Sequence, residues 1–216
     1  MIQLSTLQIV TLAAVTSALA ACRESSAAPT PKPAAAALAS SATADAATAA
    51  AAKRGEAELI ALGEHLVKAG GCGDCHTPLK MGPSGPEPDM TRMLSGHPAS
   101  MKLPPAPSPS GPWLVSIAAT NTAYAGPWGT SFTANLTPDT ATGLGNWSRE
   151  TFIQTIRSGR HLGRGRAILP PMPIPAYQNF SDDELGAVFA YLRSIPAIEN
   201  QVPEPLPPPN APKPRG

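Results

Sequence analysis

Two cysteines and a histidine stand together in Cys72-Gly73-Asp74-Cys75-His76, the segment of this chain with the most specific chemistry. Two thiols separated by two residues lie on one turn of chain, so each can add to one vinyl group of a haem. The adjacent imidazole is then held under the iron as an axial ligand. The spacing therefore predicts one covalent haem c, attached through Cys72 and Cys75, with His76 as an iron ligand.

Two other kinds of site also use paired cysteines, and both need surroundings that this sequence does not offer. A thioredoxin-like redox pair belongs in a βαβ unit, and no such pattern flanks Cys72. Half of a zinc site needs a second pair of ligands, whereas the remaining cysteine, Cys22, is far upstream. The sequence therefore favours haem attachment.

A haem that carries electrons needs a ligand on the second face of its iron. Met172 lies in a proline-rich loop, residues 169–175, where the prolines limit backbone freedom and can hold a thioether with little loss of entropy. A methionine that only fills a gap in the core is the alternative. His161, in the chain that leads to this loop, is the strongest competitor. The other candidates are His65, which we expect to be exposed, His97, which has no assigned role, and Met81, Met90, Met93 and Met101.

Three segments have the periodicity and end signals of helices, and they cover residues 56–69, 148–159 and 181–196. The first helix leads directly into Cys72. The third begins with a capping box formed by Ser181 and Glu184. No segment has a clear alternating pattern of a strand, so we expect a mainly α domain. The long segment 77–134 is rich in Pro, Gly and Met, and we expect it to wrap the haem edge with Trp113 and Trp128 as anchors.

The order of these features resembles the class I c-type cytochromes: a helix, CxxCH, a methionine in a proline-rich loop, and a final helix that contains Ala-Tyr-Leu-Arg-Ser at 190–194. Residues 134–139, Ala-Asn-Leu-Thr-Pro-Asp, and 143–148, Gly-Leu-Gly-Asn-Trp-Ser, are similar to the haem domains in cytochrome subunits of membrane-bound bacterial alcohol and gluconate dehydrogenases. The resemblance covers roughly 55–196. It implies a class I cytochrome c fold, with helices packed around one haem and a long loop insertion.

The resemblance also implies roles for single residues. His76 would be the proximal iron ligand and Met172 the distal one. Trp147 and Asn135 would belong to the cofactor-binding site, with the indole of Trp147 near a haem propionate; the alternative for Trp147 is a core anchor before a helix. Gly63 on the first helix would pack against Tyr191 or Phe189 on the last.

Composition and charge exclude one class of partner. Only 14% of the residues are charged and the formal net charge is +1, so there is no polybasic surface to neutralise nucleic-acid phosphates. We expect a redox partner protein instead: a dehydrogenase, an oxidase or another cytochrome. A cluster of arginines beside the Met172 loop could dock an acidic partner or could be a solvated loop; its members are Arg157, Arg160, Arg164 and Arg166.

The N-terminal segment has the pattern of an export signal. Leu7 to Ala20 is an apolar run of the length of a signal h-region. The tetrad at 19–22, Leu-Ala-Ala-Cys, resembles a lipobox in which Cys22 is acylated; a plain secretory signal, with Cys22 as a free thiol, is the alternative. We expect an exported lipoprotein facing the periplasm that contacts the membrane only through its lipid.

The sequence thus divides into a signal peptide (1–21), an Ala/Ser/Pro-rich tether (22–54), a haem domain (55–199) and a proline-rich tail (200–216). An electron carrier rather than an enzyme is the favoured function, either free or as the haem subunit of a periplasmic dehydrogenase complex. A haem enzyme or gas sensor with a displaceable sixth ligand is the alternative. A methionine in a proline-rich loop favours the carrier.

Overall fold

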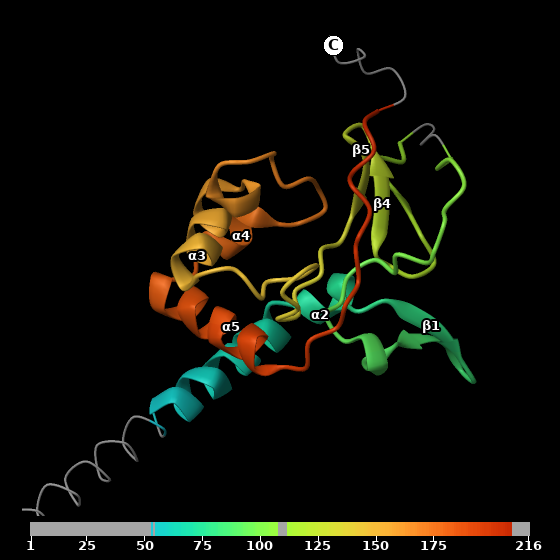
Figure 1. Cartoon of the computed structure of the whole chain (residues 1–216). Coiled ribbons are helices and arrows are strands. Elements are labelled where there is room, and N and C mark those ends of the chain that lie inside the picture. Colours follow the sequence, from blue (N-terminus) through green and yellow to red (C-terminus); the bar gives the residue numbers. More distant parts are fainter. Residues whose placement is uncertain (1–52, 54, 108–111, 209–216) are drawn as a thin grey trace, which may run out of the picture. The chain divides into compact units, whose positions relative to one another are not determined.

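The computed structural model describes residue 53, residues 55–107 and residues 112–208 (Figure 1). The predicted signal peptide, Cys22 and the tether up to residue 52 lie outside these residues. Within the described part of the chain, no helix is both long and apolar enough to cross a membrane.

Helices cover all three segments in which the sequence predicts them. The first runs over residues 55–69, α3 over Arg149–Ser158 and α5 over Asp182–Ser194. Ser148 caps α3 by accepting a hydrogen bond from the backbone N–H of Thr151, and α5 begins with the expected capping box of Ser181 and Glu184. The three helix predictions are confirmed. The shorter helical segments are α2, Cys72–His76, α4, Ile174–Tyr177, and the 3-10 turns η1, Met90–Arg92, and η2, His161–Gly163.

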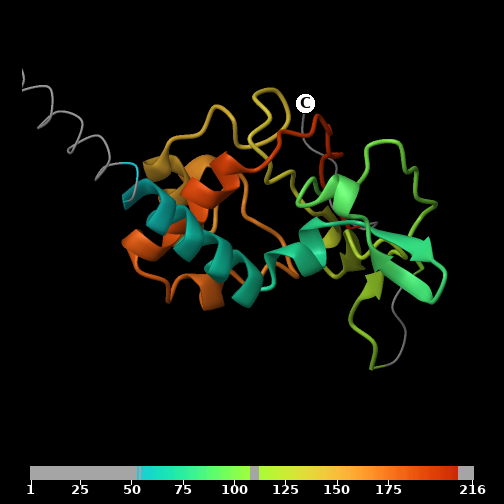
Figure 2. The same cartoon turned by 90° about the horizontal axis from the view of Figure 1, so that it is seen from below.

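The first helix packs across α5 (Figure 2), and Gly63 lies at the contact. A Cβ at this position would collide with the backbone carbonyl of Ala187 and would lie 2.8 Å from the Cβ of Tyr191. The expected contact between Gly63 and an aromatic residue of the last helix is therefore confirmed for Tyr191. The close approach depends on the missing side chain, because any larger residue would push the two helices apart.

Two small antiparallel sheets lie within the segment 77–134, so the expectation of a mainly α domain is incomplete. The first pairs β1, Leu79–Gly82, with β2, Gly85–Pro88; the second has the order β3-β4-β5, from Ser116–Ile117, Ala123–Gly126 and Gly129–Phe132. These strands are short, and β4 is buried at three successive residues, so its sequence does not alternate. Their shortness, and the unbroken burial of β4, leave no clear pattern for a search to find. In Figures 1 and 2, α2 lies between the sheets and the longer helices.

The hydrophobic core lies between the helices. Its buried members include Val67 from the first helix, Phe152 and Ile156 from α3, and Leu185 and Leu192 from α5. The first helix also carries two leucines that lie outside this core. Leu59 is 41% exposed and Leu62 is 43% exposed, although the hydrophobic period of the helix includes both. Trp113 is 76% exposed, so its prediction as an anchor was wrong.

The described part of the expected C-terminal tail packs against the domain. Asn200 is buried, and its side chain makes hydrogen bonds with Arg92, with the backbone N–H of Ala99 and with the carbonyls of Ser95 and His97. Farther on, Leu206 exchanges two backbone hydrogen bonds of 2.9 Å with Thr130 of β5. Residues 200–206 thus extend the folded domain beyond residue 199.

Candidate functional site

The CxxCH segment forms a short helix of its own, because the chain turns at Gly71 and the first helix ends before it. Gly71 has a left-handed backbone, φ 66°, which a residue without a Cβ adopts at no steric cost. It separates the first helix from α2, whose five residues are those of the motif. One helical turn therefore presents both thiols and the imidazole of His76.

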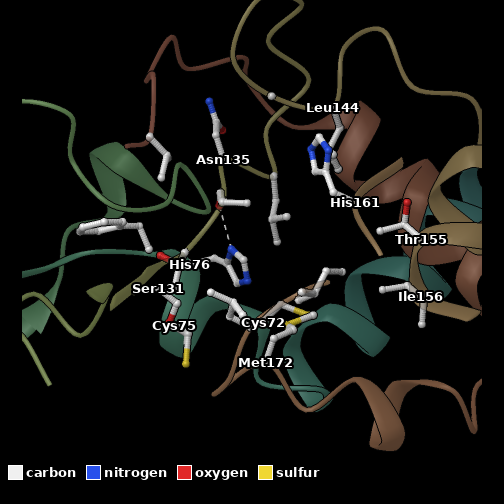
Figure 3. A pocket seen from close by; sticks show the side chains of 18 of the residues that line it. Cys72, Cys75, His76, Ser131, Asn135, Leu144, Thr155, Ile156, His161 and Met172 are labelled. Carbon is white, nitrogen blue, oxygen red and sulfur yellow. Dashed lines mark hydrogen bonds between the residues drawn. The ribbon is translucent and has the colours of Figure 1, made fainter. Parts of the chain in front are cut away.

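His76 is buried and its ring has a fixed orientation. Nδ1 lies 2.8 Å from the carbonyl oxygen of Ala134 (Figure 3). Because a carbonyl only accepts hydrogen bonds, Nδ1 carries the proton and Nε2 keeps a free lone pair. Burial lowers the pKa of His76, which favours the neutral ring. An imidazole held by a backbone carbonyl at one nitrogen is typical of a metal ligand at the other.

A mostly apolar cavity of about 310 Å³ lies beside α2. Its walls include Cys72, Cys75 and His76 from α2, together with Met172 from the proline-rich loop (Figure 3). Apolar core residues complete the walls, among them Leu144, Phe152, Ile156, Leu185 and Val188. The structure thus brings the two cysteines, the histidine and the favoured methionine to one mostly apolar cavity.

The two thiols differ in their surroundings. Burial raises the pKa of Cys72 to about 11, so this thiol stays protonated at neutral pH. Redox-active CxxC pairs instead have a cysteine of lowered pKa, which argues against a thioredoxin-like site. The hydroxyl of Tyr124 lies 3.1 Å from the sulfur of Cys75, but its shortest contact, and so the main acceptor of its one proton, is the carbonyl of Asn121 at 2.7 Å. Burial also raises the pKa of Tyr124, so the phenol remains a donor.

Met172 is half-buried and packs against the hydrophobic core. The competing methionines do not line the cavity: Met81, Met90 and Met101 are exposed, and Met93 faces a second hollow on the other side of α2. Of the histidines, His65 is exposed as expected, and His97 is fully buried against Thr122 and away from the cavity.

His161 and Trp147 both line the cavity with Met172. Their rings meet edge to face, with centroids 5.5 Å apart. Trp147 also packs against the core. The structure therefore brings the strongest competitor of Met172 into the same cavity, beside the aromatic residue that the resemblance connects with a propionate.

Asn135 lines the cavity, but its amide is used within the protein. The side-chain oxygen accepts hydrogen bonds from the backbone N–H and the hydroxyl of Thr137, and the nitrogen donates to Thr142 and to the carbonyl of Ile198. These contacts hold the loop that follows Ala134, the residue that orients His76. Asn135 thus organises the wall of the cavity through partners within the chain, and its role toward a cofactor stays a prediction.

The four arginines do not form one free basic patch. Arg157 binds the carboxylate of Asp182 at 2.7 Å and donates to the carbonyls of Gln178 and Phe180, so it fastens α3 to the chain before α5. Arg166 lines the cavity and lies 3.6 Å from Glu204. Two of the four arginines are thus engaged in ion pairs within the chain, and the choice between a docking cluster and a solvated loop stays a prediction.

Sequence reasoning missed two hydroxyl-bearing residues that line the cavity, Ser131 and Tyr177. The hydroxyl of Ser131 donates to the carbonyl of Pro170, and that of Tyr177 donates to the carbonyl of Gly70. Each contact joins residues that are far apart in the chain. No local spacing or periodicity indicates them.

Comparison with known proteins identifies relatives of one functional kind, although no family model matches the chain. Its homologues include cytochrome c subunits of dehydrogenases. The gluconate 2-dehydrogenase cytochrome c subunit of Pantoea cypripedii is 29% identical over 62% of this chain and 22% of its own length. The cytochrome c subunit of the quinone alcohol dehydrogenase of Gluconobacter oxydans is 33% identical over 36% of this chain and 17% of its own length.

A third relative, the fructose dehydrogenase cytochrome subunit of Gluconobacter japonicus, is 29% identical over 39% of this chain and 18% of its own length. The chain thus spans less than a quarter of the length of each of these relatives. The resemblance to cytochrome subunits of alcohol and gluconate dehydrogenases is confirmed, at modest identity and over part of the chain.

Proposed function

We propose that this chain transfers electrons through a single haem c, attached covalently at Cys72 and Cys75 with His76 and Met172 as axial ligands. The observation that carries the proposal is the meeting of all four side chains at one apolar cavity. The relatives, cytochrome c subunits of dehydrogenases, support it independently.

The side chains at the cavity supply the kinds of atoms that bind a haem c. Nε2 of His76 keeps its lone pair because Nδ1 is committed to Ala134, and a thioether and two thiols border the same cavity. A bound haem supplies a reversible one-electron change at its iron. The protein supplies the ligands, a fixed imidazole and apolar walls that exclude water, and His/Met ligation favours a raised potential.

The partner we propose is a dehydrogenase, with this chain as its electron-accepting cytochrome. The names of the relatives support this choice, since those proteins are subunits of gluconate, alcohol and fructose dehydrogenases. The export signal and the lipobox around Cys22 support a location in the cell envelope with a lipid anchor. Copurification of a dehydrogenase with the tagged full chain, released intact from membranes by mild detergent, tests both proposals.

A haem enzyme or gas sensor would use an open or displaceable sixth position. Met172 in the cavity wall disfavours this alternative. Exposing the reduced protein to carbon monoxide at neutral pH distinguishes the two functions. A carrier keeps its spectrum, whereas ready formation of a carbon monoxide complex would support the sensor or enzyme.

A further inference from the structure

The loop that carries Met172 is held at its upstream end by a residue of the inserted sheet. The hydroxyl of Ser131, in β5, donates a hydrogen bond of 2.6 Å to the carbonyl of Pro170, two residues before Met172. A second acceptor of this hydroxyl, the carbonyl of Tyr124, lies farther away at 3.3 Å. Since a hydroxyl has only one proton to donate, the shorter contact to the loop is the main one.

The downstream end of the same loop is held by a residue of α4. The hydroxyl of Tyr177 donates a hydrogen bond of 2.6 Å to the carbonyl of Gly70. Gly70 ends the first helix and stands two residues before Cys72. This bond therefore ties the chain just after Met172 to the chain just before the CxxCH motif.

Both contacts are partly buried. Ser131 is 7% exposed, Tyr177 is half-buried, and both line the cavity with Met172. Burial raises the pKa of Tyr177 to about 12, so its hydroxyl keeps the proton that it donates. Loss of either hydroxyl removes the partner of a partly buried carbonyl, and with it the net stabilisation of one hydrogen bond.

We propose that Ser131 and Tyr177 are positioning residues that clamp the Met172 loop at both ends and so hold its thioether in the iron coordination position. This inference rests on the proposed function, since it concerns the ligand set given there. Neither residue would touch the iron. Each acts through the backbone that carries Met172.

The clamp should weaken the binding of an external ligand to the iron. A small base such as imidazole can bind the iron only in molecules whose Met172 loop has opened, so its apparent affinity is set by the fraction of open loop. Removing one of the two hydrogen bonds favours the open loop. We expect each deletion to tighten imidazole binding by about two- to tenfold, the effect of one net hydrogen bond.

The experiment is a titration of the oxidised full-length holoprotein with imidazole, followed by its absorption spectrum. The test variants are Ser131→Ala and Tyr177→Phe. Ser194→Ala is the matched control for the first, because its hydroxyl also donates to a carbonyl, that of Tyr191 at 2.8 Å, but away from the cavity. Tyr191→Phe is the control for the second, since it removes a hydroxyl that lies on the other side of α2 from the cavity.

The clamp predicts tighter imidazole binding for both test variants and unchanged binding for the controls. Ser131→Thr, which keeps a hydroxyl, should restore the wild-type affinity, and this variant also provides a folded alternative if alanine at this position is not tolerated. Denaturant unfolding of all variants separates the clamp from general destabilisation, because a residue that only stabilises the fold would lower the unfolding midpoint without changing imidazole affinity.

Failure of the clamp and failure of the proposed function give different results. If wild-type protein binds imidazole as tightly as Met172→Ala, Met172 is not the ligand and the proposed function is wrong in its ligand set. If Met172→Ala binds imidazole much more tightly than wild type while Ser131→Ala and Tyr177→Phe match their controls, the clamp is overturned. An effect of only one test variant overturns the role of the other residue.

Discussion

At the scale of single residues, the decisive arrangement is an imidazole with one nitrogen committed and the other free. The bond from Nδ1 of His76 to Ala134 fixes the tautomer, and Asn135 fixes the loop that carries that carbonyl. A carbonyl that accepts a hydrogen bond from one ring nitrogen raises the basicity of the other nitrogen as a metal ligand. The protein chain thus prepares His76 for the role of proximal ligand that we propose for it.

Replacement of the distal ligand is the first prediction. In Met172→Ala, the weak absorption that a methionine-to-iron bond gives at the red end of the visible spectrum should disappear. The midpoint potential should also fall, because loss of His/Met ligation removes the ligand that raises it. Absorption spectroscopy and a redox titration measure both effects. A surviving red band would mean that another methionine is the ligand.

Sequence reasoning succeeds at this scale where the signal is local. The CxxCH spacing lies within one turn, and Met172 is marked by the prolines on both sides of it. Ser131 and Tyr177 carry no such mark, because their partners Pro170 and Gly70 are distant in the chain. The structure places Asn135 in the cavity wall, as its predicted role requires, but its hydrogen bonds within the chain could not be anticipated from its type.

At the scale of elements, the first helix and α5 approach each other closely at Gly63. Gly63→Ala places a methyl group against the carbonyl of Ala187. We expect a loss of about 1–3 kcal/mol in the free energy of unfolding, as for other overpacked positions. Gly55→Ala is the matched control, since a Cβ there meets nothing within 4 Å. Denaturant unfolding that finds the two variants equally stable would contradict the packing described.

The capping box of α5 gives a prediction for pH. Hydrogen bonds from Ser181, first from its backbone N–H, lower the pKa of Glu184. A carboxyl with a lowered pKa stabilises the fold above its ordinary value of about 4.3, and this contribution is lost as the pH falls through the lowered value. Glu184→Gln should therefore be less stable than wild type at pH 7, with the difference shrinking towards pH 3. A difference in unfolding midpoint that is constant with pH would rule this out.

Element prediction was most successful where the hydrophobic period and the caps agree. The helices that contain Phe152 and Leu185 have both signals, and the structure confirms them. The strands of the segment 77–134 have neither, because they are short and are stabilised by contacts across the fold, such as the pairing of Thr130 with Leu206. Tertiary context decides such elements.

At the scale of the whole domain, the chain after α5 returns to close the structure. Asn200 joins Arg92, Ala99, Ser95 and His97 through one amide. We expect Asn200→Ala to cost about 2–4 kcal/mol of stability, because several buried groups lose their partners together. Asn146→Ala, which removes one exposed hydrogen bond to Thr140, should cost about 0.5 kcal/mol or less. Thermal or denaturant unfolding compares them, and equal losses would contradict the closing role of Asn200.

The central claim is a single haem bound covalently at the CxxCH helix. Its most direct measurement is the mass of the denatured full chain and of the proteolytic peptide that contains Cys72, Cys75 and His76. We predict that the chain carries the mass of one haem, that this mass is found on that peptide, and that neither cysteine reacts with a thiol reagent. A peptide with two free thiols, or a haem that extracts into acidified organic solvent, would contradict the account.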